Sequence, residues 1–268
     1  MTDSDNNSAH NVGFFITCLA DLFRPQVGFA AVRLIEQCGC HVSVPQQSCC
    51  GQPAYNNGDD SKTRVLAKNL IDKFEQFDYM VAPSGSCAAM VKVHYPKLLK
   101  DDPNWSGRAQ NLADRTYELS QFLVDVMRVK LPLKLKLKPA QFVDDKKITY
   151  HDSCSGLREL GIRSQPRKLL NQRAGISMDE MDNSEICCGF GGTFCVKYPE
   201  ISTRLVDNKI SGIDRIEADI VLGGDLGCLM NIAGRLTRCG KQTQVFHFAE
   251  WLLDEQPETG IAGTKPKT

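Results

Sequence analysis

Short apolar runs alternate along the chain with longer stretches in which hydrophobic residues recur every three or four positions. Three runs are rich in β-branched or aromatic residues and are typical of strands: VGFFIT at 12–17, CHVSV at 40–44 and DYMVA at 78–82. The helical spacing falls at 25–37, 60–77 and 87–99. Strands that alternate with helices in this order predict a parallel sheet with helices on its faces.

The second half of the chain repeats this order. Strands are expected at 147–150, 176–181, 219–222 and 244–246, and helices at 164–174, 198–212 and 247–254. Between the halves, residues 110–128 show helical spacing, and residues 130–138 alternate with period two, as in an edge strand or an extended connector. We therefore predict an α/β fold of two pseudo-symmetric Rossmann-like halves with parallel sheets.

This pattern divides the chain into five parts. We predict a disordered N-terminus at 1–11, a first domain at 12–100, a helical connector and linker at 101–146, a second domain at 147–254 and a disordered tail at 255–268.

Charge and hydropathy exclude several classes of protein. Lys and Arg together number 32, as do Asp and Glu, so no overall attraction to nucleic acid is expected. The longest apolar runs are well short of the ~20 residues that a transmembrane helix needs. The polar N-terminus lacks the apolar core of a signal peptide, so we expect a cytoplasmic protein.

Cysteine is the abnormal component, with 12 residues in 268. In a reducing compartment, thiols in this number indicate metal ligands or redox groups rather than stable disulfides. Eight of them form two similar series. The first cysteine set is Cys18, Cys49, Cys50 and Cys87, and the second is Cys154, Cys187, Cys188 and Cys228. A glycine follows each doublet. For the other four, packing or an incidental thiol is the better interpretation: Cys38, Cys40, Cys195 and Cys239.

Each cysteine of the two sets follows a predicted strand and precedes a predicted helix. Turns of this kind gather at the carboxyl ends of parallel strands, so each set should converge into one Cys-lined site, and the two sites should face each other across a shared cleft. Soft thiolate ligands select iron–sulfur clusters or zinc. Four cysteines suit a [4Fe–4S] cluster or a structural zinc, but adjacent cysteines fit one zinc tetrahedron poorly, which favours iron–sulfur.

The doubled C…CCG…C pattern resembles the cysteine-rich CCG domain family. This family includes the B subunit of heterodisulfide reductase and the iron–sulfur subunits of glycolate oxidase and anaerobic glycerol-3-phosphate dehydrogenase. The resemblance covers residues 12–250 and is strongest to the branch of stand-alone lactate-utilisation proteins. It implies an iron–sulfur electron-transfer subunit of a cytosolic complex that oxidises L-lactate to pyruvate. All eight cysteines of the two sets would then bind the cofactor.

Two departures from the family pattern qualify this expectation. In heterodisulfide reductase each half ends in CxxC, whereas here Met90 and Asn231 stand where the fifth cysteine would be. Larger relatives also carry a CxxCxxC ferredoxin module that is absent from this sequence. The expected partners are therefore a ferredoxin-type iron–sulfur protein and a further lactate-utilisation subunit. A zinc-stabilised scaffold, or a thiol–disulfide oxidoreductase that cycles its doublets, remains as an alternative.

Two weaker motifs lie near the second set. The glycines after Cys188 resemble a truncated dinucleotide fingerprint, but the doublet already occupies that turn. His151 and Asp152, just before Cys154, are candidates for a proton relay or for orienting a ligand, and an ordinary structural histidine is an equal alternative.

Overall fold

The computed structural model describes residues 9–129, 146–172, 178–182, 184–253 and 259–263. In the first half the elements are β1 Asn11–Phe14, α1 Cys18–Phe23, α2 Pro25–Gln37, β2 His41–Ser43, α3 Gln52–Asn56, α4 Asp60–Phe74, β3 Tyr79–Ala82, α5 Gly85–Ala89, the π-helical turn η1 Met90–His94, α6 Tyr95–Leu98, α7 Ser106–Asp114, β4 Thr116–Glu118, α8 Leu119–Gln121 and the π-helical turn η2 Phe122–Val126. In the second half they are β5 Ile148–His151, α9 Cys154–Leu160, α10 Ser164–Leu170, α11 Phe194–Lys197, α12 Pro199–Arg215, β6 Ile220–Gly223, α13 Leu226–Arg238, β7 Gln244–His247, α14 Phe248–Leu252 and the 3-10 turn η3 Ile261–Gly263.

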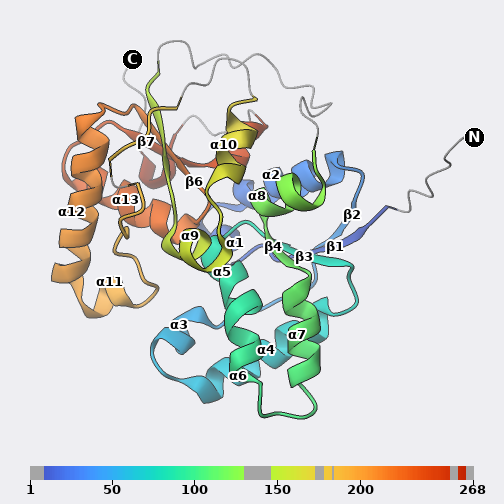
Figure 1. Ribbon diagram of the computed structural model, residues 1–268. Coiled ribbons are helices and arrows are strands. Elements are labelled where there is room, and N and C mark those ends of the chain that lie inside the picture. The colour runs from blue at the N-terminus through green and yellow to red at the C-terminus, as the bar shows by residue number, and fades with distance from the viewer. Residues whose placement is uncertain (1–8, 130–145, 173–177, 183, 254–258, 264–268) are drawn as a thin grey trace, which may run out of the picture.

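Two parallel sheets form the framework (Figure 1). The first has the strand order β2-β1-β3-β4 and the second has the order β5-β6-β7. Every pair of neighbouring strands in both sheets is parallel. The α/β fold with two parallel-sheet halves, as the sequence predicts, is therefore confirmed.

Side chains that alternate along each strand separate three regions of the core. Val12 and Phe14 of β1 face a cluster shared by both halves, and Ile148 and Tyr150 of β5 enter the same cluster. The opposite face of the first sheet packs on α4 and α7, and the opposite face of the second sheet packs on α12 and α13. Figure 1 shows these two outer helix groups on different sides of the molecule. The shared cluster is the hydrophobic contact that joins the halves.

Local signals in the sequence explain where the helices begin. Pro25 is the first residue of α2, where its missing N–H costs no hydrogen bond. Asp59 caps α4 by accepting a hydrogen bond of 3.0 Å from the backbone N–H of Lys62.

The segment between the halves differs from the expected helix over 110–128. It forms α7, then strand β4, then α8 and η2. The apolar residues do have helical spacing, but β3 offers an open edge, and β4 pairs with it in parallel. The first sheet thereby gains a strand that no local signal announced.

Some predictions fall at the margins of the described residues. The alternating segment 130–138 lies outside them, and of the strand expected at 176–181, Met178 makes an isolated parallel bridge to Ile148. In the tail, Ile261 is buried against the cluster of α12 and α13. None of the helices in the described ranges combines the length and hydropathy required to cross a membrane.

Candidate functional site: two convergent cysteine sets

The first cysteine set converges at the carboxyl ends of β1 and β3. Cys18 begins α1, the doublet precedes α3, and Cys87 lies in α5. The Sγ atoms of Cys18 and Cys49 are 3.9 Å apart, and those of Cys50 and Cys87 are 3.4 Å apart. Thus residues up to 69 positions apart in the sequence form a continuous series of neighbouring sulfurs.

The second cysteine set has the same order of contacts. Cys154 begins α9, and Cys228 lies in the first turn of α13. The thiol of Cys154 hydrogen-bonds the sulfur of Cys187, and the thiol of Cys188 hydrogen-bonds the sulfurs of Cys187 and Cys228. All eight thiols that the sequence singles out are brought together, four in each half.

The glycine after each doublet turns the backbone back onto the sulfur. Gly51 has φ +84° and Gly189 has φ +81°, a region that side chains disfavour. The N–H of Gly51 donates to the Sγ of Cys49 at 3.4 Å, and the N–H of Gly189 donates to the Sγ of Cys187 at 3.3 Å. In each CCG motif the backbone N–H of the glycine therefore stabilises negative charge on the sulfur of the first cysteine.

The sulfurs that accept these glycine N–H groups, those of Cys49 and Cys187, are also the ones that ionise most readily in each set. Hydrogen bonds from Cys18, Cys50 and the N–H of Gly51 lower the pKa of Cys49 to about 3. In the second set, Cys154, Cys188 and Gly189 lower the pKa of Cys187 to about 2. Because the thiolate is the form that binds metal, each set contains a ready anionic ligand.

The helices α5 and α9, each of which carries one cysteine of a different set, pack tightly against each other. A Cβ on Gly85 of α5 would lie 2.9 Å from the Cα of Gly156 in α9, so the two backbones meet where neither residue has a side chain. Ser84 and Ser153 cap the two helices at this crossing. Next to the cysteine sets, the two halves are therefore joined by the contact between α5 and α9.

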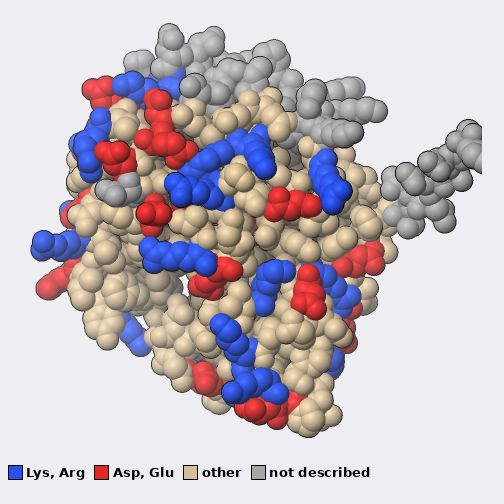
Figure 2. All heavy atoms as spheres, viewed as in Figure 1, with Lys and Arg blue, Asp and Glu red and all other residues tan. Residues whose placement is uncertain are grey.

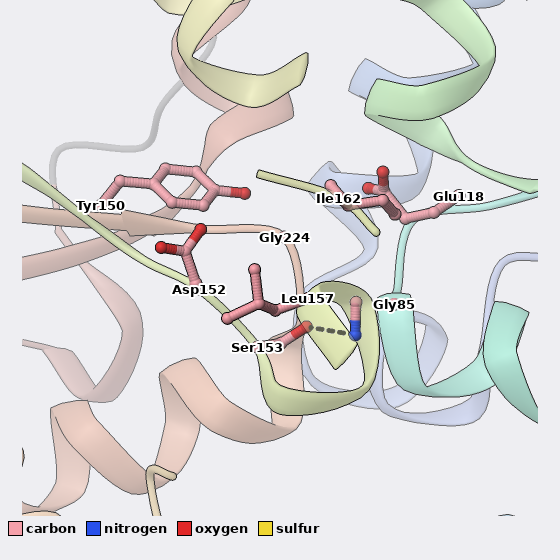
Figure 3. Close-up of a pocket in the computed structure, with 9 residues that line it drawn as sticks. Gly85, Glu118, Tyr150, Asp152, Ser153, Leu157, Ile162 and Gly224 are labelled. Carbon is pink, nitrogen blue, oxygen red and sulfur yellow. Dashed lines mark hydrogen bonds between the residues drawn. The ribbon is translucent and has the colours of Figure 1, made fainter. Parts of the chain in front are cut away.

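A small cavity lies at this crossing and draws residues from both halves (Figure 3). Its volume is about 20 Å³, which is room for about one water molecule. Glu118 and Tyr150 face each other across Gly224: a Cβ there would lie 3.4 Å from Glu118 Oε1 and 3.1 Å from the Tyr150 hydroxyl. Burial raises the pKa of Glu118 to about 7. This pocket is the cavity that the structure has at the crossing of α5 and α9.

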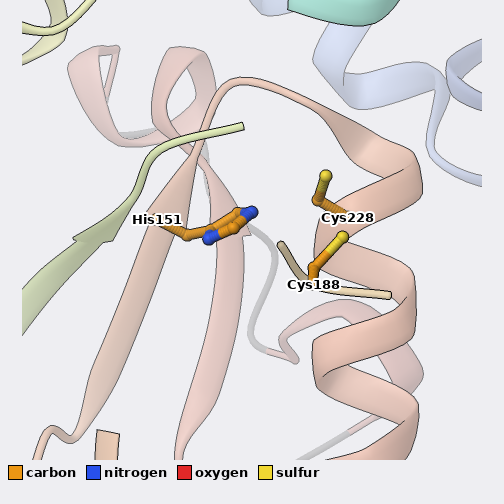
Figure 4. A group of neighbouring side chains, drawn as sticks. All are labelled: His151, Cys188 and Cys228. Carbon is orange, nitrogen blue, oxygen red and sulfur yellow. The ribbon is translucent and has the colours of Figure 1, made fainter. Parts of the chain in front are cut away.

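The motif His151-Asp152 separates into two different environments. Asp152 accepts hydrogen bonds of 2.8 and 2.9 Å from the guanidinium of Arg167 and is buried in a bidentate ion pair. His151 is 1% exposed and lies beside the second cysteine set. Figure 4 shows its ring directed at Cys188 and Cys228.

Sequence reasoning missed three buried polar residues that connect to the sites. Asp225 accepts hydrogen bonds from the turn that leads to Cys87, and His247 Nε2 is 3.1 Å from the carbonyl oxygen of Pro83 in the same turn. Lys209 is 2% exposed, and its Nζ donates to the carbonyl oxygen of Ser184 at 2.7 Å. Asp225 follows the end of β6 and His247 is the last residue of β7, and a position at a strand end is the signal that marked the cysteines.

The remaining cysteines lie in ordinary packing or surface environments. Cys38 donates to the carbonyl oxygen of Leu34 at 3.2 Å, and Cys40 is buried in the shared core. Cys195 contacts the carbonyl oxygen of Gly192 at 3.5 Å, and Cys239 is exposed. On the face shown in Figure 2, Lys and Arg are interspersed with Asp and Glu, as expected for a chain without overall charge.

Comparisons with known proteins agree with the duplicated geometry. A family model described as a cysteine-rich domain, CCG, matches residues 12–92 and 148–233. The chain is 48% identical over 249 residues to lactate utilization protein A of Halalkalibacterium halodurans, covering 92% of this chain and 98% of that protein. It is 48% identical over 242 residues to lactate utilization protein A 2 of Bacillus cereus, covering 90% and 97%. The predicted resemblance is therefore confirmed.

Proposed function

Because the chain belongs to the cysteine-rich CCG domain family, we propose that it is an iron–sulfur electron-transfer protein of lactate utilisation. The observation that carries this proposal is the convergence of four thiols in each half, in the same order of sulfur contacts. Each cysteine set would hold one cluster, with [4Fe–4S] as the proposed type. The cluster supplies one-electron chemistry when bound, and the protein supplies ligands, orientation and electrostatics.

The spacing of the sulfurs favours a cluster over a single zinc ion. Two thiolates on one tetrahedral zinc lie about 3.8 Å apart, given a Zn–S bond of about 2.3 Å. All four sulfurs would have to meet that distance mutually. In the described part of the chain, however, no three cysteines have sulfurs all within 4.8 Å of one another. Each set is an extended series of sulfurs, which suits several metal atoms better than one.

Contacts outside the doublet weigh against thiol–disulfide chemistry. In the first set Cys49 and Cys50 hydrogen-bond each other, but Cys49 also accepts from the thiol of Cys18, and the thiol of Cys50 also donates to Cys87. A vicinal disulfide would remove the hydrogen that Cys50 donates to Cys87.

The names of the relatives support lactate as the proposed substrate. These relatives are named for lactate utilisation and match nearly the whole chain. Oxidation of L-lactate to pyruvate releases two electrons and two protons, so a single-electron carrier takes the two electrons in two successive steps. We propose that this chain receives or passes these electrons in the cytoplasm, with a ferredoxin-type iron–sulfur protein and a further lactate-utilisation subunit as partners.

Anaerobic purification with iron and acid-labile sulfide assays tests the proposal. We expect a brown protein that absorbs near ~400 nm. Cys50→Ser and Cys188→Ser should each lose about half of the iron, because each removes a ligand of one of two centres. Cys239→Ser, at an exposed cysteine, is the matched control and should keep all of it.

The alternatives have distinct outcomes. A colourless protein with stoichiometric zinc would support the scaffold function instead. A metal-free protein that takes up two electrons per doublet would support the thiol–disulfide function. A brown protein whose clusters are not reduced when L-lactate and the partner proteins are added would contradict the assigned substrate.

A further inference from the structure

His151 is a buried imidazole without hydrogen-bond partners. It is the last residue of β5 and is 1% exposed, yet neither Nδ1 nor Nε2 has a partner. Buried polar atoms in folded proteins are almost always hydrogen-bonded, and an exception calls for an explanation such as a bound ion. Both nitrogens being unpartnered in the interior therefore indicates a ligand for this ring.

His247, at the matching position on the other side of β6, has hydrogen-bond partners for both of its ring nitrogens. It ends β7, and both residues pair in register with Gly223 of β6. Its Nδ1 accepts a hydrogen bond of 3.2 Å from the N–H of Ala249, and its Nε2 contacts the carbonyl oxygen of Pro83 at 3.1 Å. Two buried histidines at equivalent strand ends thus differ in one respect, namely that His151 alone lacks protein partners in the described structure.

The ring of His151 is directed at the second cysteine set (Figure 4). One of its nitrogens and the Sγ atoms of Cys188 and Cys228 all lie within 4.8 Å of one another. Among the described residues this is the single group of three His, Cys, Asp or Glu side chains that is close enough to share a metal ion. Imidazole nitrogen and thiolate sulfur are both ordinary ligands of iron and zinc.

The first half has no corresponding donor. His151 precedes Cys154 by three positions, and the residue three positions before Cys18 is Phe15. Phe15 is fully buried beside Cys50 in the cluster under the first sheet. A phenyl ring has no ligand atom, so the duplicated sites differ in their available donors.

The residue at the position of the fifth cysteine forms a hydrogen bond to the protein backbone. Asn231 occupies the position of the fifth cysteine in the related five-cysteine pattern, and its side-chain N–H donates to the carbonyl oxygen of Cys188 at 2.8 Å. Its amide thereby positions the doublet and is not directed at a metal. His151, at the end of β5, instead lies next to the sulfurs of Cys188 and Cys228.

We propose that His151 is a nitrogen ligand of the metal centre in the second half, so that the protein contains one all-cysteine centre and one mixed histidine–cysteine centre. This inference rests on the proposed function for the type of centre, iron–sulfur, but its donor set stands on the geometry. The imidazole is a neutral ligand, so it adds a nitrogen donor to the second centre without adding negative charge.

Pulsed electron paramagnetic resonance on the reduced, iron-loaded protein tests this ligand. Protein labelled with ¹⁵N-histidine should show a strongly coupled imidazole nitrogen, and the coupling should persist in Cys49→Ser/Cys50→Ser and vanish in Cys187→Ser/Cys188→Ser. His151→Phe, which installs the residue of the first half, should also lose it. His41→Ala, at an exposed histidine of β2, is the control and should keep it.

The outcomes separate this inference from the proposed function. If the wild-type protein binds iron and sulfide but no histidine nitrogen couples to either centre, the ligand assignment is overturned and the iron–sulfur function stands. The measurement on the wild-type protein needs no variant, so it tests the ligand assignment even if His151→Phe fails to fold. If the wild-type protein binds no iron, the iron–sulfur function fails, and cobalt(II) titration decides the donor set. Weaker cobalt binding with shifted absorption bands in His151→Phe then supports the ligand, and an unchanged titration overturns it.

Discussion

The Oδ2 atom of Asp225, in the second half, accepts a hydrogen bond of 2.9 Å from the hydroxyl of Ser84, in the first half. The same oxygen accepts the backbone N–H of Ser86 at 2.9 Å. Asp225 immediately precedes α13, which carries Cys228, and Ser84 caps α5, which carries Cys87. One carboxylate therefore fixes the turn of one cysteine set against the helix of the other.

Removal of this carboxylate should loosen both sites. Asp225→Ala removes the acceptor of one buried and one partly buried hydrogen bond, and we expect the free energy of unfolding to fall by about 2–3 kcal/mol. Asp225→Asn retains an acceptor oxygen and should cost less. Urea unfolding measures both, with Asp182→Ala, at an exposed residue, as the control. Equal stability of Asp225→Ala and wild type would contradict the role of Asp225 in joining the halves.

The glycines of the two CCG motifs should differ in tolerance to substitution. Both have positive φ, which costs about 1–3 kcal/mol for a side chain. At Gly189 a Cβ would also lie 2.6 Å from the carbonyl oxygen of Ser202, whereas at Gly51 the nearest atom is 3.4 Å away. We expect Gly189→Ala to be the more destabilising and to lose iron from the second centre.

Gly240 provides the control for this comparison. It has φ +67° and nothing within 4 Å of its Cβ position. Gly240→Ala should therefore show only the backbone strain and retain full iron content. If Gly189→Ala and Gly51→Ala lower stability and iron content equally, the contact with Ser202 has no energetic weight.

The buried carboxyl of Glu118 predicts a pH dependence of stability. Burial raises its pKa from 4.5 to about 7 in the folded protein. The contribution is therefore fully present below pH 4.5, and it is lost as the pH rises to about 7, because the unfolded chain ionises first. Between pH 5 and pH 8 the wild type should lose about 2–3 kcal/mol relative to Glu118→Gln.

Urea unfolding of both proteins at several pH values checks this expectation. The quantity to compare is the difference between the two unfolding free energies, since all other titrating groups then cancel. A difference that stays constant from pH 5 to pH 8 would show that Glu118 ionises normally in the folded protein.

The thiolates of the metal-free protein should differ from the packing cysteines in pH response. Alkylation by iodoacetamide follows the thiolate fraction. With pKa values lowered to about 3 and about 2, Cys49 and Cys187 are fully ionised, so their alkylation rates should stay flat between pH 5 and pH 8. Burial raises the pKa of Cys38 to about 12, so its rate should rise about tenfold per pH unit.

Peptide mass spectrometry resolves these sites individually. Iron loading should protect Cys49 and Cys187, because sulfur bound to metal no longer reacts, and should leave Cys38 unchanged. A tenfold rise per pH unit at Cys49 in the metal-free protein would contradict the hydrogen-bonded thiolate.

Local sequence signals predicted much of the secondary structure. Pro25 and the helical spacing after it predicted α2 over 25–37, which are its bounds in the structure. The order of strands and helices predicted two parallel sheets, and the doubled cysteine series predicted which thiols converge. These inferences succeeded because periodicity, proline and the carboxyl-end rule of parallel sheets act over a few residues or through chain order alone.

The sequence by itself determined the duplicated α/β architecture and the two cysteine sets. Only the tertiary structure decided that 116–118 would pair with the open edge of β3, that Asp225 would join the halves, and that His151 would lie unpartnered beside Cys188. Each of these depends on atoms from segments distant in the chain, whose contacts carry no local periodicity. The physical reason is that hydrogen bonding and ligation are set by three-dimensional proximity, whereas helix and strand preference is set by neighbours along the backbone.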